Sequence, residues 1–366
     1  MATDTPDPRE TEKAAGPRAK QLFPLADRWL HQTLAELTQP QPPATVSLPD
    51  GTRLRRLSLG VLECLPAQVS GSPLILSAGI HGNETAPIEI LDDLVAELVT
   101  GQLTACRPCL FILGNPAAIA AQTRFTSINL NRLFTLAPTR EDSDEHRRAN
   151  QLKQAVLTFA QNRPENAGPI RHYDLHTAIR ASLMERFAIF PFNPQEPERV
   201  PDQYSNRFLS AAAIEAVVMQ NKAASTFSGF IAQTLGAQAF TLELGKVRPF
   251  GENPPAAFEA ARRALASAIS GQGMSESSHP VEFEVVHEIL HTGEEFRFHV
   301  SDDTPNFTEY EPQALIWESA GAEYRVGLQP ERIIFPNPAV PKGQRAGLMI
   351  RARTGRSSES SDLRDF

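Results

Sequence analysis

Two residues of types that bind metal ions, His81 and Glu84, stand three positions apart in a short polar stretch. The stretch follows an apolar run, residues 74–80, and precedes residues 85–99, whose apolar side chains recur at helical spacing. An imidazole nitrogen and a carboxylate oxygen at this spacing can reach one cation. The pattern His-x-x-Glu is common by chance, so its meaning depends on the rest of the chain.

A third candidate ligand, His176, ends another expected strand at residues 170–176. Together with His81 and Glu84 it forms the donor set of a catalytic zinc site, which has three protein ligands and one open position. Asp174, two residues earlier in the same expected strand, lies on the same side and is the expected hydrogen-bond partner of His176, with a backbone carbonyl as the alternative partner. The sequence therefore predicts one Zn2+ per subunit.

Further candidate residues would complete a hydrolytic site. Glu243 lies near the end of the apolar run 237–245 and is the candidate general base. Arg124 could stabilise the negative charge that develops on a carbonyl oxygen during hydrolysis. Asn131 and Arg132 are candidate substrate-binding residues, because a guanidinium group pairs with a carboxylate through two hydrogen bonds. These choices predict hydrolysis of an amide or ester in an anionic substrate.

The elements that must position these residues alternate between strand and helix. Such alternation is typical of an α/β domain with a largely parallel sheet, in which sites form beyond the carboxyl ends of strands. The expected elements are a hairpin at 46–65, strands at 74–78, 110–115, 170–176 and 237–245, and helices at 22–37, 85–99, 144–161, 202–222 and 253–270.

Four parts are expected along the chain. We expect a polar arm and a helix in residues 1–40 and the catalytic domain in residues 41–275. A small β-rich domain is expected in residues 276–353, and a disordered tail in residues 354–366. In the third part, apolar and polar residues alternate as they do in half-exposed antiparallel strands.

The composition is that of an ordinary soluble protein, with 366 residues, 41% of them hydrophobic and 21% charged. A net charge of -8 argues against a nucleic acid or a membrane surface as a partner. No segment resembles a membrane span or a secretory signal, and three cysteines are an odd number for a disulfide framework. We therefore expect a cytoplasmic protein with a small anionic substrate. Whether it forms a homodimer stays open.

With these motifs, the chain resembles the succinylglutamate desuccinylase and aspartoacylase family of zinc carboxypeptidase-like amidohydrolases. The similar motifs are, in chain order, His81-Gly-Asn-Glu84, Thr123-Arg124, Asn129-Leu-Asn-Arg132, Asp174-Leu-His-Thr-Ala178 and Glu243-Leu-Gly245. The resemblance covers residues 45–350. It implies a three-layer αβα fold with a mostly parallel or mixed central sheet, a small C-terminal β domain, and the metal, base and substrate-binding roles given above.

Within this family the resemblance is greater to the desuccinylase branch. The phrases that carry it are Thr241-Leu-Glu-Leu-Gly-Lys246, Arg248-Pro-Phe-Gly251, Phe335-Pro-Asn-Pro338 and Arg345-Ala-Gly-Leu348. It implies cleavage of N2-succinylglutamate to succinate and glutamate, the last step of the arginine succinyltransferase pathway of arginine catabolism. Three alternatives stay open: an aspartoacylase-like deacylase, a metallocarboxypeptidase, and a non-catalytic protein that binds zinc or a small molecule. Asn129 departs from the family pattern, which often has Asp at this position. An Asp there would be expected to support the neighbouring arginines.

Overall fold

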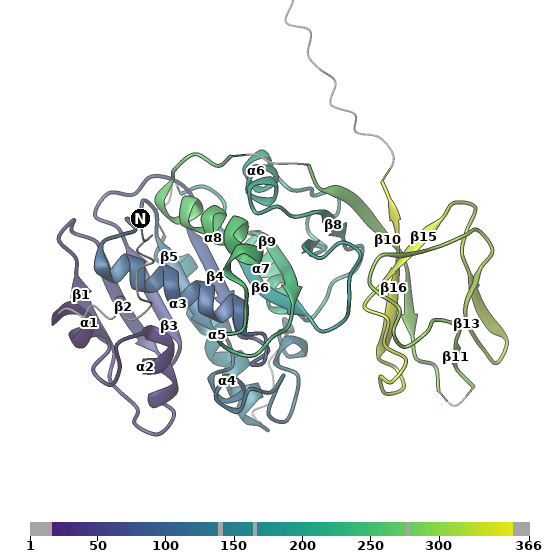
Figure 1. Cartoon of the computed structure of the whole chain (residues 1–366), viewed down its shortest axis with the longest axis horizontal. Coiled ribbons are helices and arrows are strands. Elements are labelled where there is room, and N and C mark those ends of the chain that lie inside the picture. The colour runs from purple at the N-terminus through teal and green to yellow at the C-terminus, as the bar shows by residue number, and fades with distance from the viewer. Residues whose placement is uncertain (1–16, 138–141, 164–166, 276–278, 294, 354–366) are drawn as a thin grey trace, which may run out of the picture.

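The computed structural model describes residues 17–137, 142–163, 167–275, 279–293 and 295–353. The expected tail and most of the expected arm lie outside these ranges. Helices flank a large mixed sheet, and further strands form the C-terminal end (Figure 1). This architecture confirms the predicted fold class. None of the described helices is long and apolar enough to cross a membrane.

The large sheet has thirteen strands in the described part of the chain. They pair in the order β1 (Ala44–Ser47), β2 (Arg53–Ser58), β3 (Val61–Leu65), β5 (Cys109–Leu113), β4 (Leu74–Ala78), β6 (Arg171–Ala178), β9 (Gln238–Lys246), β7 (Phe187–Phe190), β8 (Ala216–Met219), β10 (Val281–Leu290), β16 (Arg345–Ala352), β15 (Glu331–Ile334) and β12 (Thr308–Tyr310). The central strands β5, β4, β6 and β9 are parallel. Their carboxyl ends therefore meet at one edge of the sheet, where a site can form.

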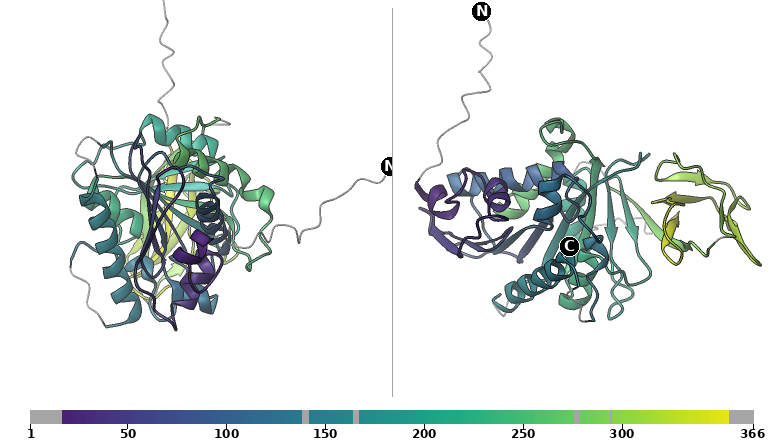
Figure 2. Two further views of the ribbon diagram at one scale, coloured as in Figure 1. Left: turned by 90° about the vertical axis from the view of Figure 1, so that its left-hand side faces the viewer. Right: turned by 90° about the horizontal axis from the view of Figure 1, so that it is seen from below.

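Helices cover both faces of this sheet and produce three layers (Figure 2). Adjacent residues of β4, Ile75 and Leu76, point to opposite faces and belong to different cores. The helices that pack on the Leu76 face are α1 (Pro17–Leu22), α2 (Trp29–Ala35), α3 (Thr85–Thr100), α6 (Gln203–Ala211) and α8 (Pro255–Ser270). The helices on the Ile75 face are α5 (Asp144–Gln161) and α7 (Phe227–Leu235). Two short elements, α4 (Pro116–Ala121) and the 3-10 helix η2 (Leu130–Arg132), lie in the connection between β5 and α5.

The C-terminal region consists of antiparallel strands, as the alternating sequence pattern predicts. The large sheet continues into it, because β10 pairs in parallel with β8 and antiparallel with β16. A second sheet of β11 (Arg297–Phe298), β13 (Leu315–Ser319) and β14 (Ala322–Arg325) packs on this extension. Ile289, Ile316 and Met349 form the core between them. The predicted domain boundary near residue 276 therefore falls within a continuous sheet, and it stays a prediction.

Two of the predicted helices are wrong. The helix expected at 22–37 is the pair α1 and α2, because Pro24 cannot continue a helix and the chain turns before Trp29. The helix expected at 202–222 ends at Ala211, and the following apolar residues form β8. β8 is enclosed between β7 and β10, so neighbouring strands bury it. The short strand β7 was not predicted.

Candidate metal centre and hydrolytic site

The turn between β4 and α3 carries His81 and Glu84. Gly82, inside this turn, lies against the backbone of α4. A Cβ atom there would come 2.1 Å from the carbonyl carbon of Ala118, so only glycine fits. The Gly82 amide also donates to the carbonyl of Arg124 at 3.3 Å. The turn is therefore fixed against the loop that carries other candidate residues.

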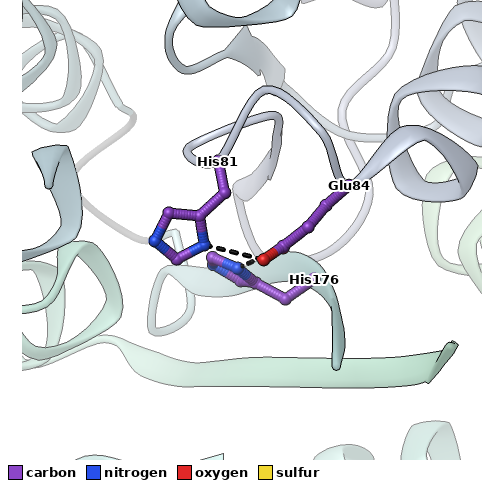
Figure 3. Close-up of side chains that lie close together, drawn as sticks. All are labelled: His81, Glu84 and His176. Atoms are coloured by element: carbon purple, nitrogen blue, oxygen red, sulfur yellow. Dashed lines mark hydrogen bonds and ion pairs between the residues drawn. The ribbon is translucent and has the colours of Figure 1, made fainter. Parts of the chain in front are cut away.

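The side chains of His81, Glu84 and His176 converge at the carboxyl ends of β4 and β6 (Figure 3). The Glu84 carboxylate lies between the two imidazoles, with Oε1 2.8 Å from His81 Nδ1 and Oε2 2.8 Å from His176 Nδ1. The candidate ligand atoms all lie within 4.8 Å of one another, and each residue is at most 4% exposed. Two imidazoles and one carboxylate are a donor set of catalytic zinc sites. The structure thus brings together the three residues chosen from sequence.

Another side chain holds the second nitrogen of each imidazole. His176 Nε2 lies 3.0 Å from Asp174 Oδ2, and His81 Nε2 lies 3.1 Å from Asn129 Oδ1. With a proton on each Nε2, both Nδ1 atoms can bind a cation. Asn129 Oδ1 also accepts a hydrogen bond from the Asn131 amide at 3.0 Å. Asn129, which stands where an Asp would be expected to support the arginines, therefore orients His81, a contact that was not predicted from the sequence.

A chain of hydrogen bonds continues behind Asp174. The Ser77 hydroxyl donates to Asp174 Oδ1 at 2.6 Å and lies 2.9 Å from His172 Nε2. Because the hydroxyl has only one proton, His172 donates to Ser77 from Nε2. Burial lowers the pKa of His172 to about 4, so its ring is neutral, and it packs on Phe227 with ring centroids 5.2 Å apart. Both oxygens of Asp174 are thus engaged, which fixes the carboxylate that orients His176.

Negative charge surrounds the two candidate imidazole ligands. Burial alone would raise the pKa of Glu84, but His81 and His176 lower it well below its usual range. Burial lowers the pKa of His176, yet Asp174 and Glu84 outweigh this effect and raise it well above its usual value. Burial also lowers the pKa of His81, and Glu84 opposes that shift only in part. Two buried carboxylates around two imidazoles favour a cation at this place.

Glu243 lies beside the candidate ligands on the neighbouring strand. It is paired with His176 in the register of β6 and β9, so both side chains lie on one face of the sheet. Its Oε2 is buried and has no hydrogen-bond partner in the described ranges. Burial raises the pKa of Glu243 to about 7, and His176 opposes this shift only in part. A carboxylate with this pKa can take up and release a proton near neutral pH.

Arg124 approaches the ligand set from the loop between α4 and η2. Its Nη1 donates to Glu84 Oε1 at 2.8 Å, while its side chain stays 35% exposed. Glu145 of α5 holds the residues that follow, accepting from the backbone amides of Thr126 at 2.8 Å and Ser127 at 3.1 Å and from both hydroxyls. The segment of Arg124 is therefore anchored, and its guanidinium lies between the candidate metal ligands and solvent.

Asn131 and Arg132, both in η2, are placed differently. Asn131 is 5% exposed, and its Oδ1 accepts from the backbone amide of Phe227 at 2.9 Å. This bond ties η2 to the start of α7, so only the amide nitrogen of Asn131 is left for a ligand. Arg132 donates to the carbonyl of Asn131 at 3.1 Å and forms no ion pair with another described residue. Of the two predicted substrate-binding residues, Arg132 has the charge available to an anion.

Two segments of the chain match models of protein families. Residues 70–269 match the succinylglutamate desuccinylase/aspartoacylase catalytic domain. Residues 278–353 match the AstE/AspA barrel-sandwich hybrid domain. The first match includes the candidate ligands and Glu243, and the second spans the C-terminal β region.

Named relatives are similar over most of the chain. A succinylglutamate desuccinylase of Ectopseudomonas mendocina is 42% identical over 319 residues, which are 85% of this chain and 93% of the relative. Solved structures of succinylglutamate desuccinylases from Vibrio parahaemolyticus and Vibrio cholerae are 34% and 35% identical, each with a TM-score of 0.84. The similar parts are 92% and 91% of this chain, and 98% and 96% of the solved chains. Sequence and fold therefore agree across both segments.

Proposed function

This chain belongs to the succinylglutamate desuccinylase/aspartoacylase family of enzymes, and from that premise we propose that it hydrolyses N2-succinylglutamate to succinate and glutamate. The reaction is the last step of the arginine succinyltransferase pathway of arginine catabolism. The observation that carries the proposal is the position of Glu243, a buried carboxylate with a pKa of about 7 beside the His81, Glu84 and His176 set. Hydrolysis of an amide needs a proton acceptor of this kind next to an electrophilic centre.

We propose that His81, Glu84 and His176 hold one Zn2+ per subunit. The residues fit the ion, because their ligand atoms lie within 4.8 Å of one another, and Asn129 and Asp174 hold the far nitrogens of the imidazoles. When bound, Zn2+ supplies a Lewis acid that polarises the amide carbonyl and lowers the pKa of water at the site.

The reaction then follows from the side chains around this centre. Glu243 Oε2, which has no partner among the described residues, takes the proton from the attacking water and later delivers it to the leaving amide nitrogen. Its pKa of about 7 suits both transfers at neutral pH, because neither protonation state is strongly favoured. Arg124, whose Nη1 is 2.8 Å from Glu84, donates to the carbonyl oxygen as negative charge develops there.

The substrate is a small anion, and basic side chains must bind it. N2-succinylglutamate has three carboxylates, and a guanidinium group binds a carboxylate through two parallel hydrogen bonds. Arg132 supplies such a group, and Asn131 holds its loop in place and can add its amide nitrogen. We propose that the protein acts on this small molecule in the cytoplasm, without a nucleic acid or membrane partner.

Glutamate release from N2-succinylglutamate by the purified, Zn2+-loaded protein tests the proposal. Glu243→Gln keeps the size of the side chain and removes the base, so kcat is expected to fall on the order of 1000-fold while bound Zn2+ is unchanged. Cleavage of N-acetylaspartate alone would assign an aspartoacylase-like activity, and cleavage of peptides alone would assign a metallocarboxypeptidase. Full activity in Glu243→Gln would refute the role of the base.

If no substrate is cleaved while one equivalent of Zn2+ is bound, the hydrolase assignment fails and the alternative of a non-catalytic binding protein is supported.

A further inference from the structure

Arg345, the first residue of β16, is turned by a bulge in the strand. In the register with β10, Leu290 lies opposite Arg345 and Ile289 lies opposite Gly347, so Ala346 is the extra residue. Ala346 packs in the core of the C-terminal region with Ile289, and the position of a Gly347 Cβ faces that same core. Because the bulge directs both residues to one face, Arg345 lies on the opposite face.

That opposite face of β16 continues, through β10 and β8, the face of the sheet that carries Phe187 of β7. Leu348 shares a buried cluster with Phe187 of β7. Glu288 lies opposite Leu348 on β10 and forms an ion pair of 3.5 Å with Lys222, which follows β8. Burial lowers the pKa of Arg345, and Glu288 opposes this shift, so the guanidinium lies near Glu288. Arg345 is therefore on the face of the sheet that continues from β16 into the catalytic part of the chain.

The loop between β8 and α7 connects this side of β10 with the loop of Arg132. At one end, Asn221 Nδ2 donates to the carbonyl of Val285 at 2.8 Å. At the other end, the Phe227 amide donates to Asn131 Oδ1 at 2.9 Å. One short loop thus holds both η2, which contains Arg132, and β10, which pairs with the strand of Arg345.

The two guanidinium groups lie within electrostatic reach of each other. The side chain of Arg132 is exposed at the surface, but the protein around its guanidinium lowers the pKa to about 10, and the next contribution is the positive charge of Arg345, ahead of that of Arg124. Neither Arg132 nor Arg345 forms an ion pair with a carboxylate of the described ranges, and Glu288 is paired with Lys222. Two like charges held in this way repel each other, and an anion bound between them removes the repulsion.

We propose that Arg345 and Arg132 together bind one carboxylate of the N-acyl amino acid substrate. The C-terminal β region then supplies part of the substrate site. The inference deepens the proposed function and rests on it for the identity of the substrate. Two guanidinium groups can share one carboxylate, because its two oxygens together accept about four hydrogen bonds.

Substitution of Arg345 tests the proposal. Arg345→Gln is expected to raise KM for N2-succinylglutamate by about 10- to 100-fold and to change kcat less than about threefold, because the lost contact is equal in ground and transition states. Arg345→Lys keeps the positive charge but lacks the forked guanidinium group, so its KM should lie between those of the wild type and Arg345→Gln. Arg351→Gln is the matched control, since Arg351 is on the same strand and pairs with Glu284 at 2.9 Å. Circular dichroism and bound Zn2+ verify that each variant is folded.

Substrates that lack one carboxylate identify the partner of the arginines. N2-succinylnorvaline lacks the glutamate side-chain carboxylate, N-succinyl-4-aminobutyrate lacks the α-carboxylate, and N-butanoylglutamate lacks that of the succinyl group. With one of these substrates the effects of Arg345→Gln and Arg132→Gln are expected to disappear, and with the other two they persist. Equal effects on all substrates, or no effect of Arg345→Gln, would overturn the proposal.

Failure of the proposed function gives a different result. If the wild-type protein releases no glutamate, calorimetric titration with succinate and with glutamate still tests the arginine pair. Arg345→Gln is expected to bind one of these two anions about tenfold or more weakly. Unchanged affinity for both would overturn the role of Arg345.

Discussion

Glu145 allows a quantitative test of how the loop of Arg124 is held. The residue is 1% exposed, and its carboxylate accepts hydrogen bonds from the backbone amides and hydroxyls of Thr126 and Ser127. Burial opposes ionisation, but these bonds outweigh it and lower the pKa of Glu145 to about 2, from a usual 4.5. Glu145→Gln removes the charge and keeps the size. Because Arg124 lies shortly before Thr126, the substitution loosens the segment that carries it.

The size of the effect follows from the pKa difference. A fall from 4.5 to about 2 favours the ionised carboxylate in the folded loop by about 3.5 kcal/mol, at about 1.4 kcal/mol per unit. Because the folded-state pKa is the lower one, this stabilisation is complete above pH 4.5 and is lost as the pH falls towards 2. The cost of Glu145→Gln is therefore expected to be about 3.5 kcal/mol at neutral pH and to shrink by about 1.4 kcal/mol per pH unit in acid.

Hydrogen exchange of the Thr126 and Ser127 amides measures this stabilisation, since both donate to Glu145. At neutral pH these amides are expected to exchange on the order of 100-fold faster in Glu145→Gln. Asp144→Asn is the matched control, because the Asp144 side chain is 82% exposed, and it should cost only a few tenths of a kcal/mol. An increase of less than about threefold in Glu145→Gln, or a difference that does not narrow in acid, would refute the reasoning.

Four further predictions concern the candidate metal centre. Gly82→Ala is expected to clash with Ala118 and to lower melting temperature and bound Zn2+ together; a variant that retains both would contradict the close packing. Ser77→Ala should weaken Zn2+ binding by roughly tenfold in chelator competition, with no change expected if the hydroxyl has no orienting role. Asn129→Asp should raise the pKa of His81 and strengthen Zn2+ binding in the same assay, and weaker binding would argue against the contact. Removal of the metal with EDTA should stop glutamate release, and added Zn2+ should restore it.

The central elements could be predicted because their own residues determine them. β4 is apolar along most of its length and fully buried, so its pattern alone predicts a strand. α5 begins after Ser143, whose side chain accepts from the His146 amide, and acidic residues follow in its first turn. Its observed ends, Asp144 and Gln161, are those predicted. The candidate metal ligands could be chosen for the same reason, since parallel strands bring residues at their carboxyl ends to one edge.

Features that depend on distant partners could not be predicted. The four residues of β8 fit a helical pattern as well as a strand, and their pairing with β7 and β10 decides the outcome. Asn129 is 48 positions from His81, and Ser77 is 97 positions from Asp174, so spacing in the chain gives no signal for these contacts. A serine inside an apolar strand was the one hint of the role of Ser77. Arg345 lies on a strand whose bulge turns it towards the catalytic part, and sequence alone does not reveal a bulge of this kind.

The continuous sheet also protects the protein against aggregation. Residues 216–219 of β8 pair with residues 281–284 of β10, and Ala216 and Val218 are fully buried. A chain that stops before residue 281 would expose the backbone donors and acceptors of an apolar edge strand, which is a template for pairing with another copy. The catalytic segment alone is therefore expected to self-associate, and newly made chains stay exposed to this hazard until β10 has been synthesised and added to the sheet.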